Sequence, residues 1–240
     1  MRVQSQPAHS RASPDVTTNE LTANKERLSH RLKGFGLTGL STLLVILLLG
    51  PAWFRALLVL AWAKWSRTPY LEIGFVRPKT WLITVSTGVV LGSFLKMVMK
   101  AVVMPLFGAP SVNQTYHYLV ANKAALPGIL FTLTVTAGFG EETVFRGYLF
   151  ERFRKIFGHR RSATIATVLI TSMIFALAHY VDQGLPGVEQ ALFTGLFFAT
   201  LFVLAGHLWL PMVAHAAFDL TALAMIYLDL ESQVAHLFFK

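Results

Sequence analysis

The chain has 240 residues, of which 54% are hydrophobic and 14% are charged, and its formal net charge is +9 at pH 7. With a mean hydropathy of +0.55, this composition excludes an ordinary soluble domain and indicates a polytopic membrane protein of about six to eight spans. The absence of cysteine excludes disulfides, thiolate nucleophiles and cysteine-ligated metals, so any catalysis depends on oxygen and imidazole groups.

Residues 1–33 are polar, mixed in charge and without an apolar run, so they cannot bury enough surface to order themselves. We expect a flexible cytosolic tail there.

The apolar segment 36–65 follows, interrupted by Gly50-Pro51 and Arg55. It is therefore either one long kinked span or a tight hairpin of two short spans.

The positively charged segments favour the hairpin. Lysine and arginine are concentrated in the tail, in 55–79 and in 146–161, and such residues prefer the cytosolic side of a membrane. A hairpin, followed by spans at 81–107 and 125–145, places all three segments on that side. The basic residues thus follow the pattern of membrane orientation, and we expect no nucleic-acid partner.

Further spans are expected at 162–180, 188–206 and 210–229, with the acidic Asp182 and Glu189 in a connection on the outer side. Together these segments predict an all-α fold, a polytopic membrane bundle of about seven transmembrane helices with a polar catalytic site inside the bundle.

The chain therefore divides into an N-terminal membrane region at 34–124, a core at 125–230 and a short C-terminal tail at 231–240. Within the first region, Lys96 and Lys100 lie one helical turn apart. They either extend toward the membrane surface, which we favour, or line a polar cavity.

Six ionisable side chains lie in the most hydrophobic half of the chain, where charged groups are costly and by default mark a functional site. They are Glu141, Glu142, Arg146, His179, His215 and Asp219.

Glu141 and Glu142 are neighbours on one helix and must point in different directions. Glu142 and Arg146 are four residues apart, so we expect them to form an ion pair. Glu141 is then the less compensated carboxylate and a candidate general base for water.

Phe175 and His179 have the same four-residue spacing on a second helix, as do His215 and Asp219 on a third. If the three helices face one interior, the two imidazoles and Asp219 converge with Glu141. Such a set could activate water and stabilise an oxyanion. Each group also has a simpler explanation, because membrane histidines and Glu-Arg pairs often serve packing alone.

In chain order these residues form three motifs. They are Glu141-Glu142-x-x-x-Arg146, Phe175-x-x-x-His179, and His215 followed four residues later by Asp219. The pattern resembles the signature of the CPBP intramembrane proteases, the CAAX-processing and bacteriocin-processing family, also called the Abi family. The resemblance covers about residues 125–225.

The resemblance implies a membrane-embedded endopeptidase in which Glu141 and His179 activate water. His215 and the residue matching Asp219 would stabilise the oxyanion, and the site would be supported by Glu142, Arg146 and Phe175. In the family the last position is often asparagine. An ionised aspartate accepts hydrogen bonds but donates none, so Asp219 must be protonated, orient His215 or bind a cation.

Metal dependence is a second open point. Glu141, His179 and His215 could hold a catalytic zinc, with Asp219 as a fourth ligand. No His-Glu-x-x-His sequence occurs, and we favour water activation by Glu141 without a required cofactor.

The expected function is hydrolysis of a peptide bond in a membrane-anchored substrate. This could be a prenylated CAAX-type protein, a bacteriocin-like peptide or a C-terminal sorting signal. A proton-coupled transporter and a non-enzymatic immunity or scaffold protein are the alternatives. We expect a multi-pass protein of the cell membrane, with its N-terminus and its site on the cytosolic side.

Overall fold

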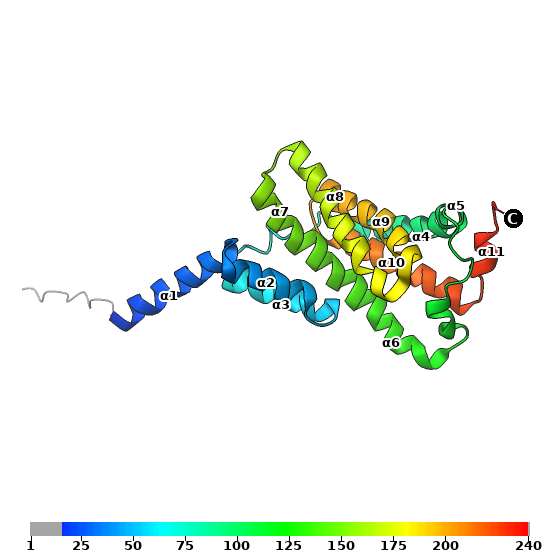
Figure 1. Ribbon diagram of the computed structural model, residues 1–240, viewed down its shortest axis with the longest axis horizontal. Helices are drawn as coiled ribbons and strands as arrows, with labels where there is room; N and C mark the ends of the chain where they lie inside the picture. Colours follow the sequence, from blue (N-terminus) through cyan, green and yellow to red (C-terminus); the bar gives the residue numbers. More distant parts are fainter. Residues whose placement is uncertain (1–15, 240) are drawn as a thin grey trace, which may run out of the picture.

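The computed structural model describes residues 16–239, and these residues contain helices and connections but no strand (Figure 1). The α-helices are α1 (Val16–Lys33), α2 (Leu37–Leu48), α3 (Ala52–Trp65), α4 (Trp81–Val98), α5 (Met104–Leu106), α6 (Leu126–Phe131), α7 (Phe150–Phe157), α8 (Arg161–Ala178), α9 (Tyr180–Ala205), α10 (Trp209–Tyr227) and α11 (Glu231–Ala235). The π-helices are η1 (Met99–Val103), η4 (Thr132–Glu141) and η5 (Thr143–Leu149), and the 3₁₀ helices are η2 (Gln114–Leu119) and η3 (Lys123–Ala125).

Within residues 16–239, five continuous helical segments are long and apolar enough to cross a membrane. They are Trp81–Leu106, Lys123–Phe157, Arg161–Ala178, Tyr180–Ala205 and Trp209–Tyr227. The number rises to six if α1 and α2, which are bent by 63° at their junction, count as one broken span. With the shorter apolar helices α2 and α3, the prediction of an all-α membrane bundle of about seven helices is confirmed.

Helices α2 and α3 form a hairpin that turns at Gly50-Pro51, as expected for segment 36–65. Gly50 has a φ of 75°, a conformation that costs glycine little. Arg55 caps the turn by donating from Nε to the Gly50 carbonyl (2.9 Å) and from Nη1 to the Leu47 carbonyl (3.0 Å). At 1.5 Å per residue the two arms are about 18 and 21 Å long, shorter than a hydrocarbon layer of about 30 Å. The hairpin therefore enters the bundle and returns to the same end.

The N-terminal segment differs from the flexible tail expected over residues 1–33. Residues Val16–Lys33 form helix α1, while residues 1–15 lie outside the described part. The end of α1 is anchored because Ser29 donates a hydrogen bond to the Ser66 carbonyl (2.7 Å) and Trp62 donates one to the Leu32 carbonyl (3.1 Å). These long-range bonds stabilise a segment that has no apolar run of its own.

The helix that begins near Leu126 does not end at residue 145, as the sequence suggested, but continues to Phe157. Arg146 and Arg152 belong to this helix and are only 1% and 2% exposed. Arg152 is held by hydrogen bonds, because it donates to the carbonyls of Lys33 and Gly34, both at 2.7 Å. The basic segment 146–161 is therefore in part buried helix and not a solvent-exposed connection.

The expected connection around Asp182 and Glu189 is also helical. Helix α9 starts at Tyr180 and includes both residues, with a kink at Gly184, whose φ is 63°. A glycine followed closely by a proline is typical of a turn. Here Gly184 and Pro186 instead produce a kink within α9.

Three close glycine contacts place the helices that carry the polar residues. A Cβ atom on Gly92 of α4 would overlap the backbone of Ala214, so α4 and α10 pack in direct backbone contact. Gly138 and Gly140 play the same part in η4, where a Cβ would lie 3.1 Å from the Met212 carbonyl oxygen of α10 and 2.6 Å from the Ala52 backbone of α3. The long helix 123–157 is thus wedged between α10 and the hairpin.

Candidate active site

A cavity of about 180 Å³ lies between the long helix 123–157 and the helices α8, α9 and α10. Its walls include Glu141 from η4, His179 from the end of α8, and His215 and Asp219 from α10. The structure therefore brings together the four side chains predicted to be catalytic, which come from three different parts of the chain.

Glu142, Arg146 and His215 form a buried network beside this cavity. Arg146 Nη1 donates to Glu142 Oε1 (2.8 Å), so the predicted ion pair is confirmed. The same oxygen lies 2.7 Å from His215 Nδ1. Since an ionised carboxylate can only accept, the hydrogen is on Nδ1, and Nε2 is left as the second ring nitrogen. The Glu-Arg pair thus also orients His215, a contact across 73 residues that sequence spacing did not predict.

Phe175 holds two members of the site by ring contacts. The Arg146 guanidinium carbon lies 4.5 Å from the centre of the Phe175 ring, and Arg146 Nη2 donates to the Gly195 carbonyl (2.9 Å). The His179 ring lies 4.6 Å from Phe175, centre to centre. A phenylalanine between a cation and an imidazole restricts both groups while adding a cation–π attraction.

The free nitrogen of His215 faces two carboxylates. Nε2 is 3.9 Å from Glu141 Oε2 and 3.6 Å from Asp219 Oδ2. Both distances exceed those of direct hydrogen bonds, as expected where a small ligand such as water can bridge polar groups. The Glu141 and Asp219 side chains are 21% and 20% exposed, whereas Glu142 is fully buried. The two adjacent glutamates therefore have different surroundings, as their positions on one helix predicted.

His179 has a defined tautomer because of its helix-end position. Its Nδ1 lies 2.8 Å from the Phe175 carbonyl oxygen, which can only accept a hydrogen bond. Nδ1 must therefore carry the hydrogen, and in the neutral ring Nε2 is an acceptor. A neutral imidazole of this kind can hold or deprotonate water.

Lys96 and Lys100 do not extend toward the membrane surface, so the prediction that we favoured for these two lysines is wrong. Both are buried, and Lys100 pairs with Glu231 at 2.8 Å. Lys96 lines the cavity, donates to Gln190 Oε1 (3.0 Å) and lies 4.9 Å from the centre of the Phe218 ring. Local spacing gave no sign of these partners, because Gln190 is 94 residues from Lys96 and Glu231 is 131 residues from Lys100.

Tyr116, in the 3₁₀ helix η2, adds a hydroxyl to the cavity wall. Burial, followed by the charge of Asp219, raises the pKa of Tyr116, so its phenol keeps its hydrogen at neutral pH. His207 lies outside the cavity, in the connection between α9 and α10. Burial lowers the pKa of His207, and its Nδ1 accepts a hydrogen bond from the Leu210 backbone (3.4 Å).

The cavity does not lie near the end of the bundle at which the sequence placed it. Because the long helix continues to Phe157, Glu141 is near the middle of a 35-residue segment. The cavity walls include Asn113, Tyr116 and Glu231, which belong to the opposite end from the connection 158–160. The site is therefore not beside the basic connections, while its placement on the cytosolic side stays a prediction.

The donor set does not fit a metal ion as it is arranged. Among residues 16–239, no group of three histidine, aspartate or glutamate side chains is placed so that it could hold one metal. Water activation without a required cofactor stays a prediction, with zinc binding by Glu141, His179 and His215 as the alternative for metal analysis, and no chemical step below depends on zinc.

Comparison with known proteins agrees with the three motifs. Residues 123–221 match the sequence model of a family described as Rce1-like, type II CAAX prenyl endopeptidase. The membrane-embedded CAAX protease MroQ of Staphylococcus aureus (strain USA300) is 29% identical over 147 residues, which cover 60% of this chain and 58% of that protein. An uncharacterized 24.3 kDa protein of Escherichia coli is 30% identical over 151 residues, which cover 61% of this chain and 63% of that protein.

No solved structure gives a significant match. The chain spans about three fifths of the length of the curated relatives it matches. Within that span the predicted resemblance to the CPBP family is confirmed.

Proposed function

We propose that the protein is an intramembrane endopeptidase that hydrolyses a peptide bond of a membrane-associated substrate. The observation that carries the proposal is the Glu141 carboxylate in the cavity wall. Its Oε2 accepts no hydrogen bond from any described residue, and it faces His215, which the Glu142-Arg146 pair orients. A carboxylate with a free oxygen beside a fixed imidazole is suited to deprotonating water.

In the proposed reaction, water lies between Glu141 and the acceptor nitrogen of His179. Glu141 removes a proton as the water oxygen bonds to the carbonyl carbon, which gives a tetrahedral intermediate. Glu141 then returns the proton to the departing amide nitrogen, the C–N bond breaks, and an acid and an amine are released. His215 Nε2, when protonated, donates to the oxyanion of the intermediate.

Asp219 has a different part from the asparagine that is frequent in the family. At 3.6 Å from His215 Nε2 it is placed to favour the protonated imidazole by its negative charge. We propose that Asp219 acts through His215 and does not itself donate to the oxyanion.

The substrate is proposed to be a lipidated or otherwise membrane-anchored peptide. The cavity combines the polar groups above with apolar walls from Leu133, Phe218, Leu223 and Ile226. Such walls suit the apolar side chains beside a scissile bond. The printed name of MroQ supports a CAAX-type substrate for that relative, and a bacteriocin-like peptide or a sorting signal fits the same chemistry.

The test is cleavage of a membrane-anchored reporter in cells by the wild type and by Glu141→Gln. We expect the variant to lose at least about 100-fold in rate, because general base catalysis contributes that much. Its abundance in the membrane should be unchanged, since Glu141 makes no buried ion pair with lysine or arginine. Glu189→Gln on α9 is the matched control and should keep full activity. Full activity of Glu141→Gln would refute the mechanism.

A proton-coupled transporter is the second candidate, favoured by the polar groups that continue from Glu141 through Asp219 and Lys96 to Glu231 along one cavity. This alternative predicts proton flux into liposomes that contain only this protein, and no released peptide. Cleavage without flux would exclude it.

A further inference from the structure

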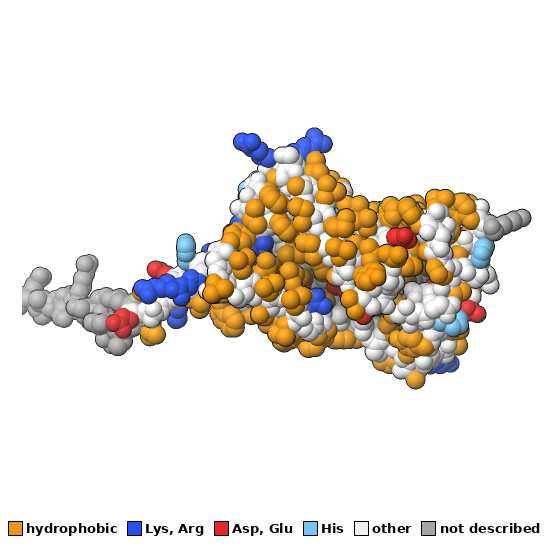
Figure 2. Space-filling model, in the orientation of Figure 1, with side chains coloured by type: hydrophobic (Ala, Val, Ile, Leu, Met, Phe, Trp, Pro, Cys, Tyr) orange, Lys and Arg blue, Asp and Glu red, His pale blue; other side chains and the backbone are white. Residues whose placement is uncertain are grey.

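The exposed basic residues of the bundle gather at one end. These residues lie in or beside the connections 66–80 and 158–160. They are Lys64, Arg67, Arg77, Lys79, Arg154, Lys155, Arg160 and Arg161. The connections at this end touch one another, since Leu208 donates to the Gly74 carbonyl (2.9 Å) and a second cavity is lined by Glu72, Arg154 and Gly206. We call this the basic end. In Figure 2, blue side chains project at the tip between α7 and α8 and along α1.

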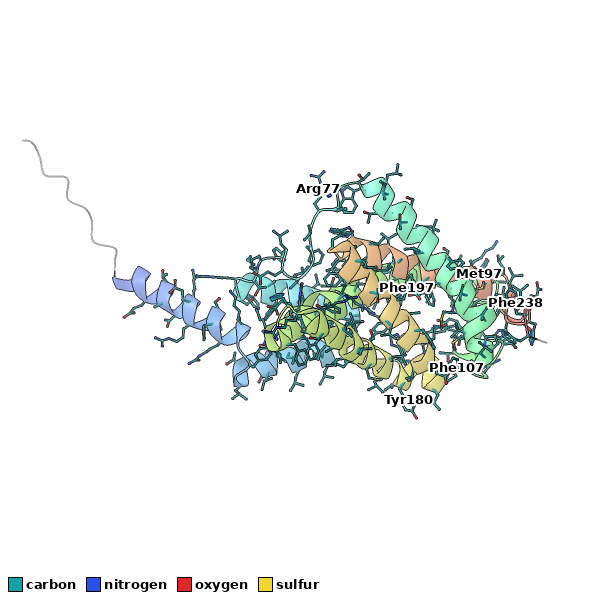
Figure 3. The ribbon with its side chains drawn as sticks, turned by 90° about the horizontal axis from the view of Figure 1, so that it is seen from above. Arg77, Met97, Phe107, Tyr180, Phe197 and Phe238 are labelled. Carbon is teal, nitrogen blue, oxygen red and sulfur yellow. The ribbon has the colours of Figure 1, made fainter. Side chains whose placement is uncertain are left out.

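The other end of the bundle carries the connections 107–122 and 228–230, together with the kinked start of α9 at 179–186. They also touch one another, because Ala121 donates to the Tyr227 carbonyl (3.1 Å) and Asn113 donates to Glu231 (3.2 Å). In Figure 3, Arg77 lies before the start of α4, while Phe107, Tyr180 and Phe238 lie at its far end. Within the described residues, Lys123 is the one exposed lysine or arginine next to these connections, and Asp182 and Asp229 are acidic.

The cavity belongs to this second end. Helix α8 starts at Arg161 on the basic end and spans 18 residues, or about 27 Å at 1.5 Å per residue, before it reaches His179. That length is close to the thickness of a hydrocarbon layer, about 30 Å. His179 therefore lies near the membrane surface opposite to the basic end, and Asn113, Tyr116 and Gln183 extend the cavity wall there.

We propose that the cavity opens on the non-cytosolic side of the membrane. Lysine and arginine in short connections face the cytosol, so the basic end is cytosolic and the cavity faces away from it. This inference rests on the proposed function for its substrate class, which is then a membrane-anchored peptide whose scissile bond is presented at the non-cytosolic face. A bond on the cytosolic side of the membrane would be out of reach of Glu141 and His179.

The absence of cysteine from the sequence makes a direct test simple, since each introduced cysteine is the only thiol in the chain. Thr115→Cys at the cavity end and Thr80→Cys at the basic end are matched, exposed positions outside the proposed catalytic groups. Intact cells that express either variant are treated with a membrane-impermeant maleimide, before and after permeabilisation. His117→Cys and His159→Cys form a second matched pair, in case one variant fails to fold.

We expect Thr115→Cys and His117→Cys to react in intact cells, and Thr80→Cys and His159→Cys to react only after permeabilisation. The reverse pattern, or equal labelling of both ends, would overturn the orientation. The readout needs no activity, so the Glu141→Gln protein with the same cysteines should label identically. Expected labelling without any peptide cleavage would leave the orientation standing and refute the proposed function alone.

Discussion

Single residues decide the chemistry of this site, and some of their contacts follow from local spacing. The four-residue interval predicted that Glu142 meets Arg146 and that His215 and Asp219 share a helix face, and both pairs lie within 4 Å in the structure. The bond from His215 to Glu142 joins residues 73 apart, so it depends on how helices pack and has no signal in the sequence.

Glu142→Gln should lower stability as well as activity. The change leaves the buried Arg146 guanidinium without its carboxylate and weakens the bond to His215. Breaking a buried pair costs about 3–5 kcal/mol, so a clear drop in unfolding temperature is expected in detergent. Glu141→Gln should unfold like the wild type. Equal unfolding temperatures for Glu142→Gln and the wild type would contradict the structural role of this pair.

Lys96 and Asp219 should act as a unit. They line one cavity, their charges act on each other, and Lys96 forms no ion pair within 4 Å with any described carboxylate. Lys96→Met should reduce kcat/KM by about tenfold, because Asp219 then faces Glu141 without a nearby lysine. Adding Asp219→Asn should cost less in the Lys96→Met background than it does in the wild type. Purely additive losses in the double variant would show that the two residues are independent.

At the scale of elements, hydropathy located the membrane helices well but missed where the long helix ends. Arg146 and Arg152 looked like parts of a solvent-exposed connection, yet inside the bundle Arg146 pairs with Glu142 and Arg152 donates to the distant Lys33 carbonyl. The sequence also gave no sign that residues Thr132–Leu149 are largely π-helical. Long π-helical stretches are rare and frequently occur at functional sites, so local propensity does not reveal them.

The contact of α4 with α10 should be sensitive to one methyl group. Gly92→Ala would place a Cβ inside the backbone of Ala214 and shift α10, which carries His215 and Asp219, relative to Glu141. We expect a loss of about 1–3 kcal/mol in stability together with reduced cleavage. Gly128→Ala is the control, because a Cβ there meets open space, and it should be neutral in both assays. An active and stable Gly92→Ala protein would contradict the packing described for these helices.

At the scale of the whole molecule, the distribution of lysine and arginine predicted a common side for the basic connections, and the structure groups them at one end. The depth of the site was not predictable in the same way, since it depends on the length of the helix that carries Glu141. A helix ending at residue 145 puts the site beside the basic connections, whereas a helix ending at Phe157 puts it toward the opposite surface.

The central claim is that Glu141 activates water for peptide hydrolysis in this bundle. The most direct measurement is mass spectrometry of a membrane-anchored peptide in liposomes that contain only the purified protein. We expect two products from the wild type whose masses sum to that of the peptide plus one water, and an intact peptide with Glu141→Gln. An intact peptide with the folded wild type, or the same two products from both proteins, would contradict it.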